Sequence, residues 1–156
     1  TMRVHIGGDH AAYELQRALV THLQQSGHEV IDHGPLDYDA QDDYPVYVLR
    51  AAVAVAEDIG SRGIVLGGSG NGELIAANKV PGVRAAYASS PELAMLARQH
   101  NDAHVIAMGG RFVDVPTGLA TADAFLATDF SGDERHARRL AMVTDFELDG
   151  DLPPLP

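Results

Sequence analysis

The sequence predicts a single α/β domain in which a five-stranded parallel sheet is covered by helices on both faces. Short runs rich in β-branched residues alternate with longer segments of helical period, which is the pattern of repeated βα units. The 156 residues have the length of one domain, and no repeat, low-complexity block or linker divides them. We expect the domain to span residues 1–148 and the proline-rich tail, 149–156, to be frayed.

The strands are the short apolar runs. They are expected at Arg3–Ile6, Glu29–His33, Arg62–Leu66, Val83–Ala86 and Val105–Met108.

The helices are placed by apolar spacing and by their start and stop signals. In the first helix, apolar residues recur from Leu15 to Leu23, and Ser26-Gly27 ends it. Proline suits a first helical turn, so Pro45, Pro91 and Pro116 mark three further starts. The expected ranges are about 15–25, 44–60, 70–80, 90–100, 116 onward and 133–148.

Composition excludes several classes of protein. With 22 acidic and 11 basic residues the formal charge is −11, which repels nucleic acid and anionic membranes, so neither is expected as a partner. Cysteine is absent, so no disulfide, thiolate zinc site or cysteine nucleophile is available. No apolar run approaches the ~20 residues of a membrane span, and we expect a soluble chain without an export signal.

Ligands of open parallel sheets bind beyond the carboxyl ends of the strands, so the segments after the strands are the first candidates for a site. Gly7-Gly8-Asp9-His10 follows the first strand. This segment reads either as a glycine turn in which Asp9 caps a helix, or as a carboxylate and imidazole that hold a sugar hydroxyl or move its proton.

The segment after the third strand, residues 67–73, has the sequence Gly-Gly-Ser-Gly-Asn-Gly-Glu. Its backbone N–H groups could surround an anion at a helix N-terminus. It lacks the Lys-Ser/Thr of a P-loop, and a dinucleotide fingerprint would follow the first strand instead, so NAD and ATP are disfavoured as ligands. Glu73 reads either as a capping-box acid or as a carboxylate base beside an oxyanion hole.

Basic residues gather in a few places of this acidic chain. Arg98-Gln99-His100-Asn101 is a polar break, Gly110-Arg111 follows the fifth strand, and Arg135 and Arg139 share one face of the last helix. His100 alone reads more simply as a helix C-cap, and the last helix as a solvated face. Together, Arg111, Arg135 and Arg139, joined by His10, predict one cationic pocket for a small phosphate.

Six segments, taken in order, resemble the type B ribose-5-phosphate isomerases. They are the Gly-Gly-Asp-His loop, Asp43-Tyr44-Pro45, the glycine loop with residues 75–79, Arg98 to Asn101, Gly110-Arg111, and Arg135-His136 with Arg139. That family includes the galactose-6-phosphate isomerases. The resemblance covers residues 2 to about 146. It implies a Rossmann-like αβα sandwich, a cytoplasmic homodimer or tetramer of dimers with active sites shared at the interface, and interconversion of D-ribose 5-phosphate and D-ribulose 5-phosphate without metal or organic cofactor.

The resemblance also assigns roles. His100 would open the furanose ring, and Asp9 and Asn101 would hold sugar hydroxyls. The phosphate would be bound by His10, Arg111, Arg135 and Arg139, and the neighbouring subunit would receive His100, Asn101 and Arg111. The enediolate would be steadied by Ser69 and by the loop amides of Gly68, Gly70, Asn71 and Gly72.

One departure from the family concerns the base. Many members have a cysteine directly after the third strand, where this chain has Gly67, and Glu73 is the expected replacement, as in an actinobacterial branch that this sequence is similar to. A partly buried glutamate with a raised pKa could move the proton between C2 and C1. Two other readings stay open: an isomerase of a six-carbon sugar phosphate, such as allose 6-phosphate or galactose 6-phosphate, and a non-catalytic sugar-phosphate sensor.

Overall fold

A computed structural model describes all residues, 1–156, and confirms the predicted α/β class. One parallel sheet has the strand order β2-β1-β3-β5-β4. Its strands are β1 Arg3–Gly7, β2 Glu29–Asp32, β3 Arg62–Gly67, β4 Ala85–Tyr87 and β5 Val105–Gly109. The helices are the 3-10 turn η1 His10–Ala12 and α1 Tyr13–Gln25, α2 Tyr44–Glu57, α3 Asn71–Asn78, α4 Pro91–Asn101, α5 Val115–Ala127 and α6 Glu134–Asp149.

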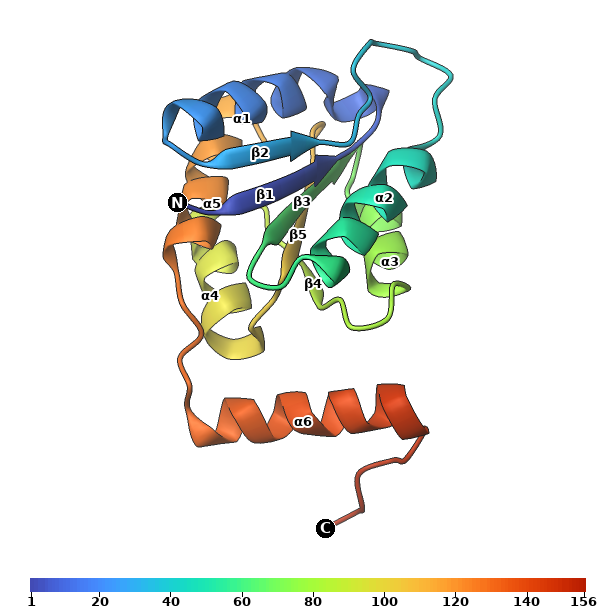
Figure 1. Cartoon of the computed structure of the whole chain (residues 1–156), viewed down its shortest axis with the longest axis vertical. Coiled ribbons are helices and arrows are strands. Elements are labelled where there is room, and N and C mark those ends of the chain that lie inside the picture. Colours follow the sequence, from blue (N-terminus) through green and yellow to red (C-terminus); the bar gives the residue numbers. More distant parts are fainter.

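The sheet is the middle layer of three (Figure 1). Helices α1, α4 and α5 cover one face, where Ile6, Leu19, Ile64, Met108 and Phe125 form the core. Helices α2 and α3 cover the other face, where the core side chains are smaller, mostly valine and alanine. The central strands β1, β3 and β5 are buried on both sides, which explains why they read as continuous apolar runs.

Several predicted boundaries shift by one to three residues. Strand β4 begins at Ala85 instead of Val83, because the Val83 N–H donates to the Val80 carbonyl in a turn after α3. Helix α2 ends at Glu57 instead of Gly60, because the Asp58 carbonyl accepts from the Ser61 N–H in another turn. Strand β2 ends at Asp32, one residue early. Local turns compete with regular structure at such ends.

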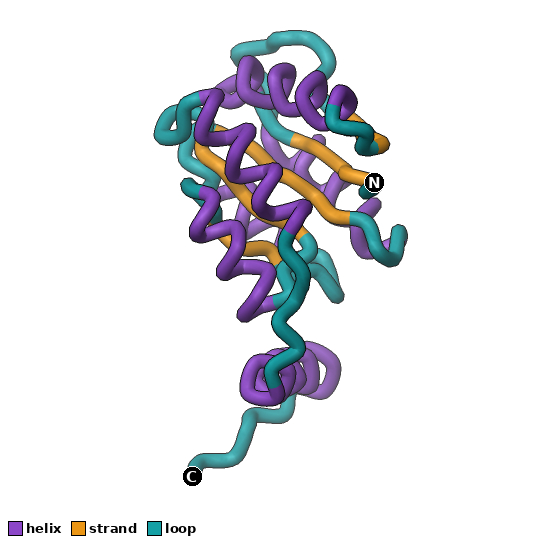
Figure 2. Tube along the Cα trace, turned by 90° about the vertical axis from the view of Figure 1, so that its left-hand side faces the viewer, coloured by secondary structure: helices purple, strands orange, loops and turns teal.

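Helix α6 lies apart from the sandwich, beyond the ends at which the strands begin (Figures 1 and 2). Only His136 among its sixteen residues is buried, and Met142, Val143, Phe146 and Leu148 are exposed. The following residues, 150–156, form no helix or strand and are exposed; that they are frayed stays a prediction. No helix combines the length and the hydropathy that crossing a membrane requires.

Candidate active site

The predicted site residues fall at two ends of the sheet. The segments after β1, β3 and β5 meet at the carboxyl edge, because these three strands are neighbours in the sheet. This carboxyl-edge group comprises Asp9, His10, the glycine loop from Gly68 to Gly72, Glu73 and Arg111. The remaining residues, His100, Asn101, Arg135 and Arg139, belong to α4 and α6 and lie at the opposite end.

The glycine loop is tied to the end of β5. The Gly110 N–H donates to the Gly67 carbonyl at 2.7 Å, and the Arg111 N–H donates to the Gly68 carbonyl at 3.1 Å. Gly70 is the N-cap of α3 and has a φ of +90°, a conformation that favours glycine. Ser69 accepts from the Asn71 N–H at 3.2 Å through its hydroxyl, so its oxygen supports the turn. The loop therefore holds a fixed shape at the N-terminus of a helix.

Glu73 occupies the space that a side chain at Gly67 would need. A Cβ placed on Gly67 would overlap with the Glu73 carboxylate. Only 4% of Glu73 is exposed, and this burial, with a smaller contribution from the charge of Asp9, raises the pKa of its carboxyl. The only backbone group that lowers its pKa is its own N–H, so the carboxylate does not close a capping box to Gly70. The Glu73 side chain can therefore take this position only because residue 67 is a glycine.

The surroundings of Asp9 are consistent with both predicted roles, a helix cap and a residue of the binding site. Its carboxylate accepts from the Ala11 N–H at 2.9 Å and caps η1, as the simpler interpretation expects. It is also 8% exposed, and burial raises its pKa, which is the environment of a group that interacts with a ligand. A capping role and a place in the site are compatible.

His10 is paired with a residue that sequence reasoning did not include. Its Nδ1 lies 2.6 Å from Oδ1 of Asp42, on the loop between β2 and α2. Ligand atoms of Asp9, His10 and Asp42 lie within 4.8 Å of one another. The Asp9 and Asp42 carboxylates already accept hydrogen bonds from protein N–H groups. We therefore interpret His10 and Asp42 as a hydrogen-bonded ion pair and not as ligands of a metal ion. His10 also lines the largest cavity, of about 630 Å³, with Tyr38 and Gly110; Glu73 does not line it.

Two further residues approach the glycine loop. The Arg111 guanidinium covers Gly68 of its own chain, with Nη1 3.3 Å from a Cβ placed there. That Arg111 is lent to a neighbouring subunit stays a prediction. The Tyr44 ring covers Gly72, where a Cβ would lie 2.7 Å from its hydroxyl oxygen. Tyr44 was predicted as a helix start and as part of the motif Asp43-Tyr44-Pro45, and its sequence neighbours give no sign of this contact.

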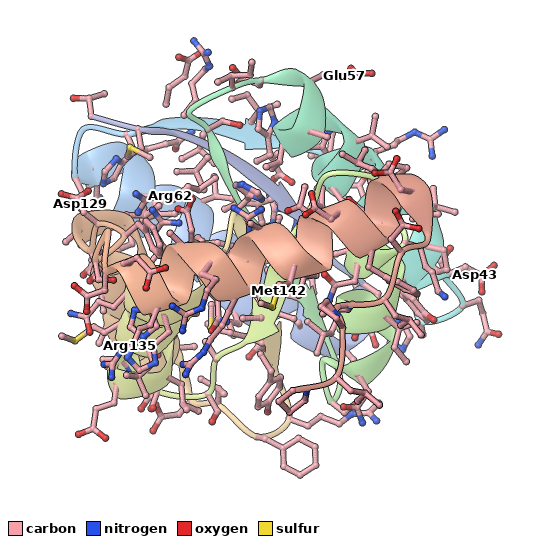
Figure 3. All side chains as sticks on the ribbon, turned by 90° about the horizontal axis from the view of Figure 1, so that it is seen from below. Asp43, Glu57, Arg62, Asp129, Arg135 and Met142 are labelled. Carbon is pink, nitrogen blue, oxygen red and sulfur yellow. The ribbon has the colours of Figure 1, made fainter.

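The opposite end carries the second group. His100 and Asn101 close α4, and the His100 ring stacks on His136 of α6 with ring centroids 4.4 Å apart. Arg135, labelled in Figure 3, directly precedes His136 on α6 and is therefore close to this end of α4. Within one chain, Arg135 and Arg139 of α6 therefore lie at the end of the sheet opposite to Arg111 and His10. A single cationic pocket needs a second copy of the chain and stays a prediction.

The start of α6 is held in place by α4. Two buried arginines, Arg62 and Arg98, donate to the carbonyl of Thr128, where the connection to α6 begins. The Ser131 N–H then donates to the Gln99 carbonyl, and its hydroxyl lies 2.9 Å from Nδ1 of His136. Burial, helped by the charges of neighbouring groups, lowers the pKa of His136. The exposed arginines of α6 are thus presented by a fixed support.

Comparison with known proteins agrees with the sequence motifs. The sequence model of the ribose/galactose isomerase family matches residues 4–143. A ribose-5-phosphate isomerase B of Mycobacterium tuberculosis is 53% identical over 155 residues, covering 99% of this chain and 96% of that protein. The ribose-5-phosphate isomerase B of Escherichia coli is 39% identical over 145 residues, covering 93% and 96%.

Solved structures share the fold. The ribose-5-phosphate isomerase B of Clostridium thermocellum superimposes with a TM-score of 0.90 at 40% identity, covering 96% of this chain and all of that one. That of Mycoplasma genitalium, solved with bound ribulose-5-phosphate, gives a TM-score of 0.90 at 35% identity, covering 96% and 98%. The chain therefore belongs to the ribose/galactose isomerase family, among its type B ribose-5-phosphate isomerases.

Proposed function

We propose that this chain interconverts D-ribose 5-phosphate and D-ribulose 5-phosphate, with Glu73 as the base that moves the proton between C2 and C1. The observation that carries the proposal is the buried Glu73 carboxylate at the end of β3, with its raised pKa, beside the glycine loop. A base whose pKa approaches the working pH can both take and return a proton. The relatives named above act as ribose-5-phosphate isomerases, and one was solved with ribulose-5-phosphate.

The loop amides supply the second requirement of the reaction. Removing a proton from C2 leaves a cis-enediolate whose negative oxygens need donors. Gly68, Gly70 and Gly72 place backbone N–H groups at the N-terminus of α3, which carries a partial positive charge, whereas the Asn71 N–H donates to the Ser69 hydroxyl. Each such donor is worth on the order of 2.7–4 kcal/mol in measured enzymes. No metal or organic cofactor enters this scheme.

Binding the phosphate and opening the ring require basic groups that, within a single chain, lie at the end of the sheet opposite to Glu73. We propose a homodimer, alone or paired into a tetramer, in which His100, Asn101, Arg135 and Arg139 of one copy complete the carboxyl-edge group of the other. Their exposure and the unpartnered apolar residues Val143 and Phe146 of α6 support this arrangement. His100 would open the ring. Because phosphorylated sugars are anions that do not cross a bilayer unaided, we place the enzyme in the cytoplasm.

The activity is tested by incubating the protein with ribose 5-phosphate in heavy water. We expect ribulose 5-phosphate to form and deuterium to enter the sugar at C1 and C2. Binding without conversion or exchange would instead identify a sensor. Because the family also contains galactose isomerases, the same assay is run with allose 6-phosphate and galactose 6-phosphate. Faster turnover of a six-carbon substrate would overturn the assignment of the pentose.

Sharing of sites is tested by mixing two impaired variants, Glu73→Gln and the double variant Arg135→Ala/Arg139→Ala. The assay uses ribose 5-phosphate well below the wild-type KM, where each variant alone turns over little substrate. Random reassociation makes half of the dimers mixed, and each mixed dimer contains one intact site, so about a quarter of the wild-type activity should return. Sites built from one chain would show no recovery, which would contradict the dimer proposal while leaving the reaction untouched.

A further inference from the structure

Asp42 contacts His10 twice, although 32 residues separate the two in sequence. Its Oδ1 lies 2.6 Å from Nδ1 of the His10 ring and also accepts the His10 backbone N–H at 3.2 Å. The Asp42 side chain is 4% exposed, and its other oxygen, Oδ2, is buried without a hydrogen-bond partner. No other cation pairs with this carboxylate, so His10 is the group that balances its charge.

This contact decides what the imidazole can offer to a ligand. Because Nδ1–H donates to Asp42, Nε2 is the ring nitrogen left for a partner, and it carries a proton whenever the ring is cationic. The His10 side chain is 26% exposed and lines the cavity of about 630 Å³. A cationic ring in this place can donate from Nε2 to an anionic oxygen.

Three charged groups act on His10. Asp42 raises the pKa of the imidazole through the hydrogen bond, and the charges of Asp9 and Asp42 raise it further. Burial and the charge of Arg111 act in the opposite direction and are smaller in sum, so the pKa of His10 lies above its ordinary value. The protonated ring is therefore kept to a higher pH than that of a free histidine.

The loop that carries Asp42 is anchored independently of this contact. The Tyr13 hydroxyl donates to the Leu36 carbonyl at 3.1 Å, and the Tyr38 ring packs edge-on against the Tyr13 ring. The Gln16 side-chain amide donates to the Gly34 carbonyl at 2.9 Å. Removing the charge of Asp42 should therefore leave the loop in place.

We propose that Asp42 is a positioning residue for the isomerisation: it fixes His10 as an imidazolium whose Nε2–H donates to the substrate phosphate. The inference rests on the proposed function for the identity of that phosphate. Asp42 itself touches no substrate and acts through His10.

The first test needs no substrate. The variant Asp42→Asn has the same shape and keeps an acceptor for Nδ1–H, and Asp37→Asn, an exposed residue of the same loop, is the matched control for charge. NMR titration of His10 should show its midpoint moving to lower pH in Asp42→Asn and unchanged in Asp37→Asn. Inorganic phosphate should raise the His10 midpoint in the wild type. An unchanged midpoint in Asp42→Asn would overturn the proposal.

The second test separates positioning from stability. At a pH between the two midpoints, Asp42→Asn should raise KM for ribose 5-phosphate on the order of tenfold and change kcat little, because one charge-assisted bond is weakened. Below both midpoints His10 is protonated in either protein, and the difference in KM should disappear. An equal rise in KM at every pH would show a structural role instead.

A double-variant cycle tests the route of action. If Asp42 acts through His10, Asp42→Asn should add no further rise in KM in a His10→Asn background. An additive rise would overturn the proposal. If the wild type fails to isomerise ribose 5-phosphate, the proposed function fails, while the titration with inorganic phosphate still decides whether Asp42 sets the charge of His10.

Discussion

The two ends of the sheet differ in how far their candidate site residues are exposed to water. At the carboxyl edge, Glu73 and Asp9 are 4% and 8% exposed, and burial raises the pKa of both. At the other end, His100, Arg135 and Arg139 are exposed on α4 and α6. A buried carboxyl with a raised pKa suits proton transfer, whereas exposed arginines keep their charges hydrated and free to pair with an anion. The proposed base is thus buried inside the chain, whereas the proposed phosphate ligands are exposed.

The largest effect is expected when the buried end loses its charge. Glu73→Gln keeps the shape of the side chain and removes the base, so kcat should fall by about 10²–10⁴ while KM for ribose 5-phosphate stays near the wild-type value. Steady-state kinetics of the sugar-phosphate conversion measures both. Activity retained in this variant would rule out Glu73 as the base.

The same variant should be more stable than the wild type at neutral pH. A carboxyl whose pKa is raised by folding contributes stability below its unfolded pKa and loses it as the pH rises through the folded pKa. Glutamine cannot ionise, so this loss is absent. Thermal melting against pH should show the Tm advantage of Glu73→Gln over the wild type growing as the pH rises from the unfolded to the folded pKa of Glu73 and staying constant above it. A lower Tm above the folded pKa would contradict the burial argument.

The substitution Gly67→Ala perturbs the carboxyl edge by a steric clash and leaves the charge of Glu73 in place. The added methyl group overlaps with the Glu73 carboxylate and must displace it. A shift of about 1 Å in a catalytic group costs on the order of a hundredfold in rate, and overpacking costs about 1–3 kcal/mol of stability. Kinetics and urea unfolding measure the two effects.

The control for this substitution is the double variant Gly67→Ala/Glu73→Ala. Removing the carboxylate makes room for the methyl group, so the double variant should recover stability but no activity. If Gly67→Ala is as stable as the wild type, Glu73 does not fill the space above Gly67.

Much of the molecule could be predicted from sequence because its signals are local. The βα alternation gave the correct architecture, and the run of glycines before Glu73 marked the loop at the end of β3. The contacts that sequence reasoning did not foresee join residues distant in sequence. Arg111 lies on its own Gly68 because the hydrogen bonds between the ends of β3 and β5 bring it there, and no spacing rule encodes that contact.

The contacts of Asp42 and Tyr44 were missed for a related reason. The segment from Gly34 to Asp43 has no periodicity, and its course over η1 depends on anchors such as Tyr13 to Leu36. A pattern analysis sees only an acidic loop there. The separation of Arg135 from His10 likewise depends on where the connection after α5 leads, which residues 128–133 do not reveal by composition.

At the open end, smaller effects on binding are expected. Arg135→Ala and Arg139→Ala should each raise KM on the order of tenfold and leave kcat nearly unchanged, since each removes a charge-assisted bond to the phosphate. Arg138→Ala is the matched control on the same helix, because Arg138 already pairs with Glu134 at 2.6 Å. An equal rise in KM for Arg138→Ala would mean that general charge, and not a phosphate site, is responsible.

Ionic strength should distinguish the two ends with the smallest change. Added KCl shortens the Debye length, to about 10 Å at 0.1 M, and screens exposed charges far more than buried ones. We expect KM to rise a few-fold between about 0.01 and 0.1 M salt, whereas kcat, which depends on buried Glu73, stays constant. In Arg139→Ala the dependence of KM on salt should be weaker than in Arg138→Ala. If kcat falls with salt instead, the proton transfer itself takes place in solvent, and the contrast between a closed catalytic end and an open binding end is wrong.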